Sequence, residues 1–459
     1  MLVAGVDSST QSTKVEIRDA QTGALVRSGR APHPATTPPR SEQDPHDWWT
    51  ALTAARDEAG GFEDCASVSI GAQQHGLVVT DAAGSPLRPA KLWNDTESAP
   101  DAGWLLEQLD DGAAAWADAC GSVPVAAFTI TKLSWLHRNE PEVFARIERV
   151  VLPHDWLVWM LTGEFQTDRG DASGTGYWSP AIGQYRFDLL EIVDRDTDWR
   201  AALPPVADAT TALGTGDNMA AALGLGLQPG DVVFSLGTSG TVFAVSDAPT
   251  ADASGAVAGF ADGTGRFLPL VCTLNATKVT DAIGRLLGAD HAELDALALA
   301  APAGAGGATL LPYFDGERTP NRPDARGALS GLTSAVSREE VARAAFEGVV
   351  CGLLDGLDAL RAVDVPVGGR CYLIGGGARS SAYVQILADL AQRAVTVVND
   401  ELVARGAGVQ AAARATASTI ADVQNGWSLG EGTEVEPSIG PDGAAEVLAA
   451  YASRRDALV

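Results

Sequence analysis

The sequence predicts an α/β fold built from two comparable halves. Short runs of β-branched and aromatic residues alternate with longer amphipathic stretches along the 459 residues, a pattern typical of α/β proteins. A strand–turn–strand pattern near residue 10 recurs near residue 238, and ten of the eleven Trp lie before residue 200. The repeat indicates two halves of similar construction, and the Trp distribution indicates that the halves differ in origin or task.

The predicted strands are short apolar runs bounded by turn-forming residues. They are Leu2–Asp7, Lys14–Arg18, Ala66–Ile70, Leu77–Asp81, Val232–Ser235, Thr241–Val245, Tyr372–Ile374 and Val395–Val398. The clearest predicted helices repeat apolar residues every three to four positions. They are Leu133–Arg149, Glu339–Ala362 and Ser381–Arg393.

A glycine-rich stretch, Gly214–Gly230, is the predicted boundary between the halves. We therefore expect an N-terminal domain over residues 1–225 and a C-terminal domain over residues 226–459. Each domain contains a predicted hairpin, with the turn segments Ser9–Val15 and Gly237–Phe243. Turns of this kind expose backbone N–H groups and hydroxyls, so two of them facing one another would bind a polyphosphate from both sides. The alternative for either turn alone is an ordinary surface turn.

Composition excludes several classes of protein. The chain has 59 acidic and 32 basic side chains, a net charge of −27, so it offers no basic face for a nucleic acid. Its longest uncharged run, Ala296–Phe314, contains several Pro and Gly and is interpreted as a buried loop entering a strand, so we expect no membrane segment. Met1 leads directly into an apolar strand without the basic segment of a signal peptide, so we expect a cytoplasmic protein.

Two residue types are scarce enough to be informative. The five Cys are odd in number and never spaced C-x-x-C, which favours buried thiols over disulfides or a zinc site. Lys occurs only at positions 14, 91, 132 and 278, so each of these residues merits inspection.

The first predicted turn carries candidate metal and phosphate ligands. Asp7 ends the first apolar strand, and its carboxylate suits Mg²⁺ held beside phosphates. Thr10 lies in the turn, and Lys14 would add a point charge. A solvated turn aspartate is the alternative for Asp7.

Asp217 precedes the apolar segment Met219–Leu225, which indicates a position at or next to a helix N-terminus. There the helix dipole and free N–H groups are expected to keep its carboxylate ionised at neutral pH. The functional interpretation is a general base that accepts the proton of an alcohol attacking a γ-phosphorus. The alternative is a simple N-cap.

Candidate ligand contacts follow other predicted strands. Gln74 and His75 come after Ala66–Ile70, and Trp93 closes another extended segment. Amide, imidazole and indole together suit a polyhydroxylated ligand, whereas a lone His after a strand is often structural. Gly375–Ser381 leaves a strand and opens a helix, where a flat nucleoside could approach the backbone. The chain lacks Walker-type and Rossmann-type phosphate motifs.

Ten short motifs, taken in order, resemble those of bacterial xylulokinases in the FGGY family of carbohydrate kinases, and they span nearly the whole chain. They are Val6-Asp7-Ser8-Ser9-Thr10, Ser41-Glu42-Gln43-Asp44-Pro45 with Trp48-Trp49, Gln74-His75-Gly76, Leu92-Trp93-Asn94-Asp95, Leu161-Thr162-Gly163-Glu164-Phe165, Asp171-Ala172-Ser173-Gly174-Thr175, Gly216-Asp217-Asn218, Ser235-Leu236-Gly237-Thr238-Ser239-Gly240, Gly316-Glu317-Arg318-Thr319-Pro320 and Gly375-Gly376-Gly377-Ala378-Arg379-Ser380.

The resemblance implies two actin-like (ribonuclease H-like) domains, with a catalytic cleft between an N-terminal sugar-binding domain and a C-terminal ATP-binding domain. By motif match it implies Asp217 as the catalytic base and Asp7 as the Mg²⁺-linked residue. The implied sugar contacts are Gln74, His75 and Asn218, to which the residues themselves add Trp93. The implied ATP contacts are Thr238, Gly376, Gly377 and Ser381, to which the first turn adds Thr10 and Lys14. The family usually carries Met at the position of Gln74.

The expected activity is ATP- and Mg²⁺-dependent phosphorylation of a ketopentose, with D-xylulose giving D-xylulose 5-phosphate as the first choice. Two alternatives remain open. One is a kinase of another ketose or polyol, because the fold and catalytic parts are shared within the family. The other is an actin-like nucleotide switch, which would need neither Asp217 nor His75. The expected partners are a small sugar and ATP, with a homodimer as the assembly to consider.

Overall fold

The computed structural model describes residues 1–398 and 400–457, which divide into two compact units. Unit 1 contains Met1–Leu227, Asp247–Leu268 and Asp400–Gly430, and unit 2 contains Gln228–Ser246, Pro269–Asn399 and Glu431–Val459. The chain first leaves unit 1 after Leu227, close to the predicted boundary at residue 225. The division differs from the predicted pair of continuous domains, because residues 247–268 and 400–430 return to unit 1.

The main sheet of unit 1 has the strand order β13-β5-β1-β2-β3. Its strands are β13 (Gly214–Gly216), β5 (Cys65–Ala72), β1 (Leu2–Ser8), β2 (Ser12–Asp19) and β3 (Leu25–Pro32). β1 pairs antiparallel with β2 and parallel with β5. The first predicted hairpin is therefore confirmed, and the mixture of parallel strands with helices confirms the α/β class.

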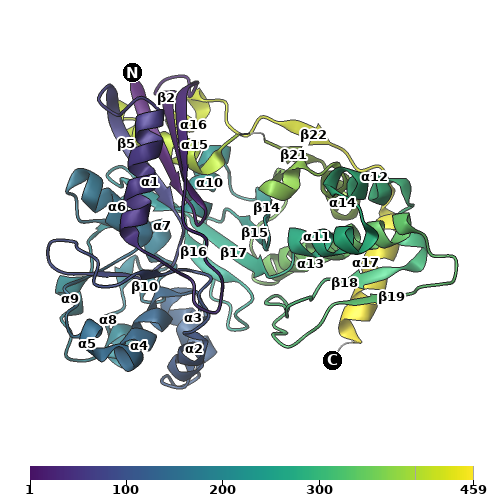
Figure 1. The fold of residues 1–459 in the computed structure, drawn as a ribbon, viewed down its shortest axis with the longest axis horizontal. Coiled ribbons are helices and arrows are strands. Elements are labelled where there is room, and N and C mark those ends of the chain that lie inside the picture. The colour runs from purple at the N-terminus through teal and green to yellow at the C-terminus, as the bar shows by residue number, and fades with distance from the viewer. Residues whose placement is uncertain (399, 458–459) are drawn as a thin grey trace. The chain divides into compact units, whose positions relative to one another are not determined.

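Alternate residues of β1 face two different helical layers. Ala4 and Val6 are buried in the cluster formed with Trp48 of α1 (Pro45–Glu58) and Leu157 of α6 (Pro153–Thr162). Val3 is buried on the other side, in the cluster that contains α15 (Leu402–Thr416) and Leu223 of α10 (Asp217–Leu225). Because strand side chains alternate, Asp7 points to the same side as Val3. The metal candidate thus belongs to the face of the sheet that α10 and α15 cover. These two helices lie next to each other in Figure 1.

Glycines let α15 approach both α10 and β1. A Cβ at Gly406 of α15 would clash with the carbonyl oxygen of Ala220 in α10, and one at Gly5 of β1 would clash with that of Ala404 in α15.

Trp427, which follows α16 (Ile420–Gly426), donates from Nε1 to the carbonyl oxygen of Ala20 at 3.1 Å. All eleven Trp therefore lie in unit 1.

A second core in unit 1 is mainly helical. Its helices are α2 (Ala99–Leu106), α3 (Ala113–Cys120), α4 (Thr129–Asn139), α5 (Pro141–Phe144), α8 (Phe187–Val193) and α9 (Trp199–Ala202). The single helix predicted over Leu133–Arg149 is wrong, because α4 ends before Pro141 and Arg149 begins a strand. Proline disfavours the α conformation in the residue that precedes it, which explains the break.

Short elements complete unit 1. They are β4 (Glu42–Gln43), β6 (Val78–Thr80), β7 (Ala90–Lys91), β8 (Arg149–Val151), β9 (Thr167–Asp168), α7 (Arg169–Ala172), β10 (Trp178–Ser179), β11 (Gln184–Tyr185), β12 (Val206–Ala207) and β16 (Ala258–Ala261).

The sheet of unit 2 contains β17, β15, β14, β20, β21 and β22 in that order. Their bounds are β17 (Phe267–Thr273), β15 (Gly240–Ala244), β14 (Val232–Leu236), β20 (Cys371–Ile374), β21 (Val395–Val397) and β22 (Thr433–Val435). β14 pairs antiparallel with β15 and parallel with β20. The second predicted hairpin is thus confirmed, and the carboxyl ends of β14 and β20 lie side by side.

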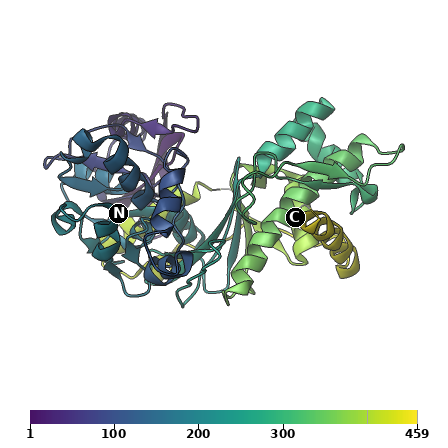
Figure 2. The ribbon, with the colours of Figure 1, turned by 90° about the horizontal axis from the view of Figure 1, so that it is seen from below.

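Helices pack around this sheet. They are α11 (Thr277–Leu287), α12 (His291–Ala300), α13 (Arg338–Ala362), α14 (Ser381–Ala391) and α17 (Pro441–Asp456), with short turns η1 (Ala305–Gly307) and η2 (Gly376–Arg379) and strands β18 (Thr309–Leu311) and β19 (Ala328–Ser330). Ser337 and Glu340 form a capping box that starts α13 at its predicted position. α17, near the label C in Figure 2, contacts α13 and α14.

The run Ala296–Phe314 begins in the last turns of α12 and ends beyond β18. The predicted entry into a strand is therefore confirmed, but the helical start was not predicted. Within residues 1–398 and 400–457, none of the helices is long and apolar enough to cross a membrane. All five Cys are free thiols.

Candidate functional site

Asp217 is the first residue of α10, directly after the N-cap residue Gly216. Its Oδ1 accepts hydrogen bonds from the backbone N of Asn218 at 2.8 Å and from Asn218 Nδ2 at 3.0 Å. Burial raises the pKa of Asp217 to about 7, and the carboxylates of Asp7 and Asp171 add to this effect. The expectation that the helix terminus keeps Asp217 fully ionised at neutral pH is therefore wrong, because burial and like charges outweigh the helix N-terminus.

Gln74 joins Asp217 through Asn218. Asn218 Nδ2 donates to Gln74 Oε1 at 2.9 Å, and the Gln74 side chain packs so closely on Gly216 that a Cβ there would lie 2.6 Å from Gln74 Cγ. Gln74 is 4% exposed, and its Nε2 is buried with no hydrogen-bond partner among the described residues. A buried amide donor in this condition is costly unless a ligand satisfies it.

Asp7 and Lys14 are cross-strand partners in the first hairpin. Lys14 Nζ lies 3.2 Å from Asp7 Oδ2 and 2.6 Å from Glu401 Oε2. Burial raises the pKa of Asp7 despite the opposing charge of Lys14. Asp7 Oδ1 is buried and has no hydrogen-bond partner in the part of the chain that the structure describes. A buried carboxylate oxygen without a partner fits a divalent cation or its water.

Thr10, expected in the phosphate turn, contacts a residue expected to bind sugar. Trp93 Nε1 donates to Thr10 Oγ1 at 2.9 Å, and Thr10 Oγ1 donates to Gln73 Oε1 at 3.2 Å. Gln43 Nε2 donates to the Thr10 carbonyl oxygen at 3.0 Å. The indole of Trp93 is 40% exposed and therefore still offers surface to a ligand. Gln43 lies in one of the sequence motifs, and its contact with the turn was not predicted.

His75 adopts a left-handed backbone conformation, with φ of 65°. Its Nδ1 lies 2.8 Å from the Gly174 carbonyl oxygen, which requires the proton on Nδ1. The ring lies beside Phe128 and Phe260, with centroid distances of 5.1 Å and 5.4 Å. In this tautomer Nε2 is a hydrogen-bond acceptor, which matches a hydroxyl donor.

Unit 1 also contains a buried ionic cluster of His154, Asp155, Asp168 and Asp171, which was not predicted. His154 Nδ1 lies 2.6 Å from Asp171 Oδ2, and its Nε2 lies 3.1 Å from Asp155 Oδ1. Burial lowers the pKa of His154, but the surrounding carboxylates, which include Asp168, raise it to about 9. Asp168 Oδ2 also accepts from the Thr215 hydroxyl at 2.7 Å, two residues before Asp217. The only sequence signal was the motif that begins at Asp171.

In unit 2, the nucleotide candidates gather at the carboxyl ends of β14 and β20. Thr238 is exposed in the turn after β14, and its carbonyl oxygen accepts from the backbone N of Ala276 at 3.2 Å. Gly377 packs on Leu236 of β14, where a Cβ would lie 2.6 Å from the Leu236 Cβ. Gly376 faces open space within 4 Å of its Cβ position. Thr238, Gly376 and Gly377 are thus brought to one sheet edge.

Ser381 is the first residue of α14, and its hydroxyl lies 3.3 Å from Asp295 Oδ2. The preceding residue Ser380 caps the helix and donates to Asp295 Oδ1 at 2.7 Å. Lys278 Nζ forms an exposed ion pair with Asp315 at 2.9 Å. The two bonds to Asp295 hold the start of α14, which directly follows the glycine turn.

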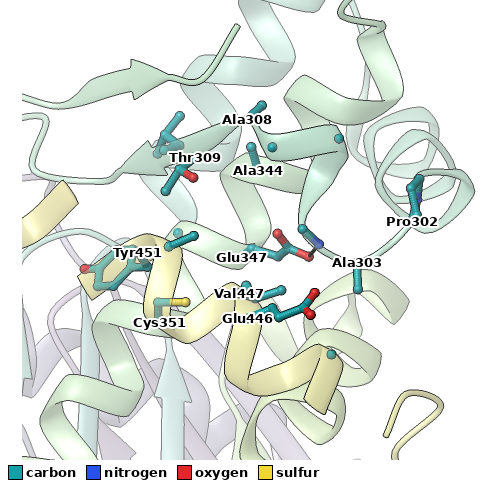
Figure 3. Close-up of a pocket in the computed structure, with 17 residues that line it drawn as sticks. Pro302, Ala303, Ala308, Thr309, Ala344, Glu347, Cys351, Glu446, Val447 and Tyr451 are labelled. Atoms are coloured by element: carbon teal, nitrogen blue, oxygen red, sulfur yellow. Dashed lines mark hydrogen bonds between the residues drawn. The ribbon is translucent and has the colours of Figure 1, made fainter. Parts of the chain in front are cut away.

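A separate cavity of about 360 Å³ lies in unit 2 between η1, β18, α13 and α17. Glu347 and Glu446 present carboxylates on its wall, with Cys351 and Tyr451 nearby (Figure 3). None of the predicted site residues lines this cavity.

Comparison with known proteins agrees with the expected fold. Two family models match: the N-terminal domain of the FGGY family of carbohydrate kinases over residues 2–245, and the C-terminal domain of that family over residues 232–415. The chain is similar to the xylulose kinase of Streptomyces coelicolor, at 46% identity over 94% of this chain and 92% of that protein.

Solved structures give the same picture. The xylulose kinase of Bifidobacterium adolescentis superposes with a TM-score of 0.86 at 40% identity, covering 99% of each chain. A gluconate kinase of Lactobacillus acidophilus superposes with a TM-score of 0.89 at 22% identity, covering 100% of this chain and 98% of that one, which shows the fold alone. The expected two-domain kinase fold is confirmed.

Proposed function

Because the chain belongs to the FGGY family of carbohydrate kinases, we propose that it transfers the γ-phosphoryl group of ATP to the terminal hydroxyl of D-xylulose, giving D-xylulose 5-phosphate and ADP. An ATP-dependent sugar kinase is what the family membership establishes. The choice of xylulose rests on the 46% identity to a xylulose kinase over nearly the whole length of both chains.

Asp217 is the general base of this proposal. The hydroxyl oxygen of the sugar attacks the γ-phosphorus, the bond to the ADP oxygen breaks, and the hydroxyl proton moves to the Asp217 carboxylate. A general base works best when its pKa lies near the working pH, and the pKa of about 7 supports Asp217 in this role. Asn218 donates two hydrogen bonds to Asp217 Oδ1, which leave the other carboxylate oxygen to meet the substrate.

Sugar binding is assigned to Gln74, His75, Trp93 and Asn218. The buried Nε2 of Gln74 is a donor that a sugar oxygen would satisfy, and Asn218 connects Gln74 to Asp217. His75, with its proton on Nδ1, would accept a hydrogen bond from a sugar hydroxyl at Nε2. The half-exposed indole of Trp93 offers an apolar face to the carbon atoms of the sugar.

Mg²⁺ is assigned to Asp7, on the strength of its buried and unpartnered Oδ1. When bound, the ion would neutralise charge on the phosphates. Thr10 and Lys14 lie in the same hairpin and are proposed phosphate contacts. In unit 2, Thr238 would bind phosphate, and Gly376, Gly377 and Ser381 would bind the nucleoside, because these residues follow the adjacent strands β14 and β20 and Gly376 faces open space.

A substrate panel tests the proposal. ADP release is measured with D-xylulose, L-xylulose, D-ribulose, L-ribulose and glycerol at fixed ATP and Mg²⁺. We expect the highest kcat/KM with D-xylulose. A higher value with another sugar would refute the choice of xylulose and leave the kinase chemistry standing. Light scattering of the same sample gives its molar mass and tests whether the chain forms a homodimer.

A further inference from the structure

Lys132 is a buried lysine in α4, with an exposed fraction of 0%. Its Nζ donates to two backbone carbonyl oxygens, that of His75 at 3.1 Å and that of Ala127 at a shorter distance. Among residues 1–398 and 400–457, no carboxylate forms an ion pair with it. Burial lowers the pKa of Lys132 to about 7, although the charge of Asp95 opposes this effect.

A buried ammonium group of this kind is costly in comparison with an apolar side chain of the same length. Its neighbours on α4, apolar Leu133 and polar Thr131, are equally buried, so a polar group at this position needs hydrogen-bond partners. The carbonyl oxygens of Ala127 and His75 are those partners, and the bond to His75 ties α4 to a residue assigned to the sugar.

The backbone that Lys132 contacts is strained. His75 has φ of 65°, a region that residues with a side chain rarely adopt, and such a conformation persists only when its surroundings fix it. Two donors from the first turn of α4 meet the His75 carbonyl oxygen: Lys132 Nζ, and the Thr129 hydroxyl at 3.3 Å. Phe128, the N-cap residue of the same helix, packs on the imidazole.

The ring and the backbone of His75 are thus held from two sides. α4 fixes the carbonyl group, and the Gly174 carbonyl oxygen fixes the proton on Nδ1. If the carbonyl group were released, φ of His75 could leave the left-handed region, and this change would turn the Cα–Cβ bond and carry the imidazole away from Gly174.

We propose that Lys132 is a positioning residue for sugar binding, which acts by holding the left-handed turn at His75. This inference rests on the role of His75 proposed above. Lys132 contacts no reacting atom and is not among the residues assigned to sugar binding.

Steady-state kinetics test the proposal with Lys132→Met, which keeps the length and removes the donor. We expect the KM for D-xylulose to rise about tenfold and the KM for ATP to stay within about twofold. Ser134→Ala is the matched control, because Ser134 is buried on the same helix and its hydroxyl bonds to Asp101 at 2.8 Å instead of to His75. The control should leave both KM values within about twofold.

A double-mutant cycle separates this role from a general loss of stability. If Lys132 acts through His75, then Lys132→Met should have little further effect on sugar KM in a His75→Ala background. Equal effects in both backgrounds would overturn the inference. Thr129→Val, which removes the weaker donor, should shift sugar KM in the same direction by a smaller factor and remains informative if Lys132→Met folds poorly.

A spectroscopic arm is independent of activity. The chain has only six His, so ¹⁵N-labelled histidine gives few imidazole signals, and His75→Gln identifies that of His75. The Nδ1–H tautomer pattern should be lost or mixed in Lys132→Met and kept in Ser134→Ala. An unchanged pattern with unchanged sugar KM would overturn the inference. A changed pattern with no effect of His75→Ala on sugar KM would refute the proposed sugar contact instead.

Discussion

The hairpins β1–β2 and β14–β15 share a strand–turn–strand arrangement and differ in the side chains that precede the turn. In β1–β2, Asp7 is paired across the strands with Lys14, directly before the last pair of the hairpin, Ser8 with Thr13. In β14–β15, the corresponding pair is Ser235 and Thr241. The first hairpin therefore carries a partly buried charge pair, whereas the second offers hydroxyls and an exposed turn at Thr238. The same local fold therefore suits the two roles proposed for it, because a carboxylate suits a cation and neutral donors suit a phosphate.

The largest effect is expected where unit 1 supplies the base. Asp217→Asn keeps the shape of the side chain and removes the proton acceptor, so kcat should fall by about 10²–10⁴ while sugar affinity changes only a few-fold. Turnover assays and calorimetry with D-xylulose check this. Full kcat in the variant would remove Asp217 from the mechanism.

The two hairpins are compared directly by Asp7→Ala and Ser235→Ala. Asp7→Ala removes the metal candidate and should lower kcat by about 10² and raise the Mg²⁺ concentration needed for half-maximal rate. Ser235 occupies the matching position in β14, so the kcat of Ser235→Ala should stay within about threefold of that of the unmodified enzyme. Similar losses in both variants would mean that the hairpins are equivalent.

The pH dependence of kcat/KM tests the carboxylate site of unit 1. The corresponding pair of the second hairpin, Ser235 and Thr241, has no charged group. A raised carboxyl pKa favours the protonated form, so the base is lost as pH falls through about 7. We expect kcat/KM for the sugar to approach a decline of about tenfold per pH unit below that value. Asp171→Asn removes a negative neighbour and should move this limb to lower pH. A midpoint near the ordinary carboxyl range would contradict the assignment.

Thr238→Val and Thr10→Val test whether the two turns bind the same ligand. Thr238→Val should raise the KM for ATP by about three- to tenfold and leave sugar KM within about twofold. Thr10→Val also removes the acceptor for Trp93 Nε1, so it should raise the sugar KM as well. A rise in ATP KM alone for both variants would show that Trp93 is positioned without Thr10.

The smallest effect concerns the unusual amide in unit 1. Gln74→Met should lower kcat/KM for D-xylulose by about threefold, because one buried donor is lost. The ratio of kcat/KM for D-xylulose to that for L-xylulose, D-ribulose or L-ribulose should therefore become smaller. The same ranking of the four sugars with both proteins would show that Gln74 does not touch the substrate.

Local patterns predicted the hairpins, because alternating apolar residues and turn residues lie close together in the chain. They also indicated Gln74, His75 and Asp217 as separate candidates. The bond from Asn218 to Gln74 joins residues 144 positions apart, and the ion pair of Lys14 with Glu401 joins residues 387 apart, so no local pattern encodes them. The raised pKa of Asp217 likewise depends on Asp7 and Asp171, which only the folded chain brings near.

The position of α15 affects how the chain folds during its synthesis. Gly406 and Ala404 of this helix contact α10 and β1, the elements that carry Asp217 and Asp7. About 170 residues separate the end of the first unit 1 segment from the start of α15, so the ribosome needs roughly 10–35 s to deliver the missing helix. During that interval the nascent unit 1 lacks the partner for the apolar surface that Val3 and Leu223 later share with Val409, so this surface is prone to aggregation until translation nears its end.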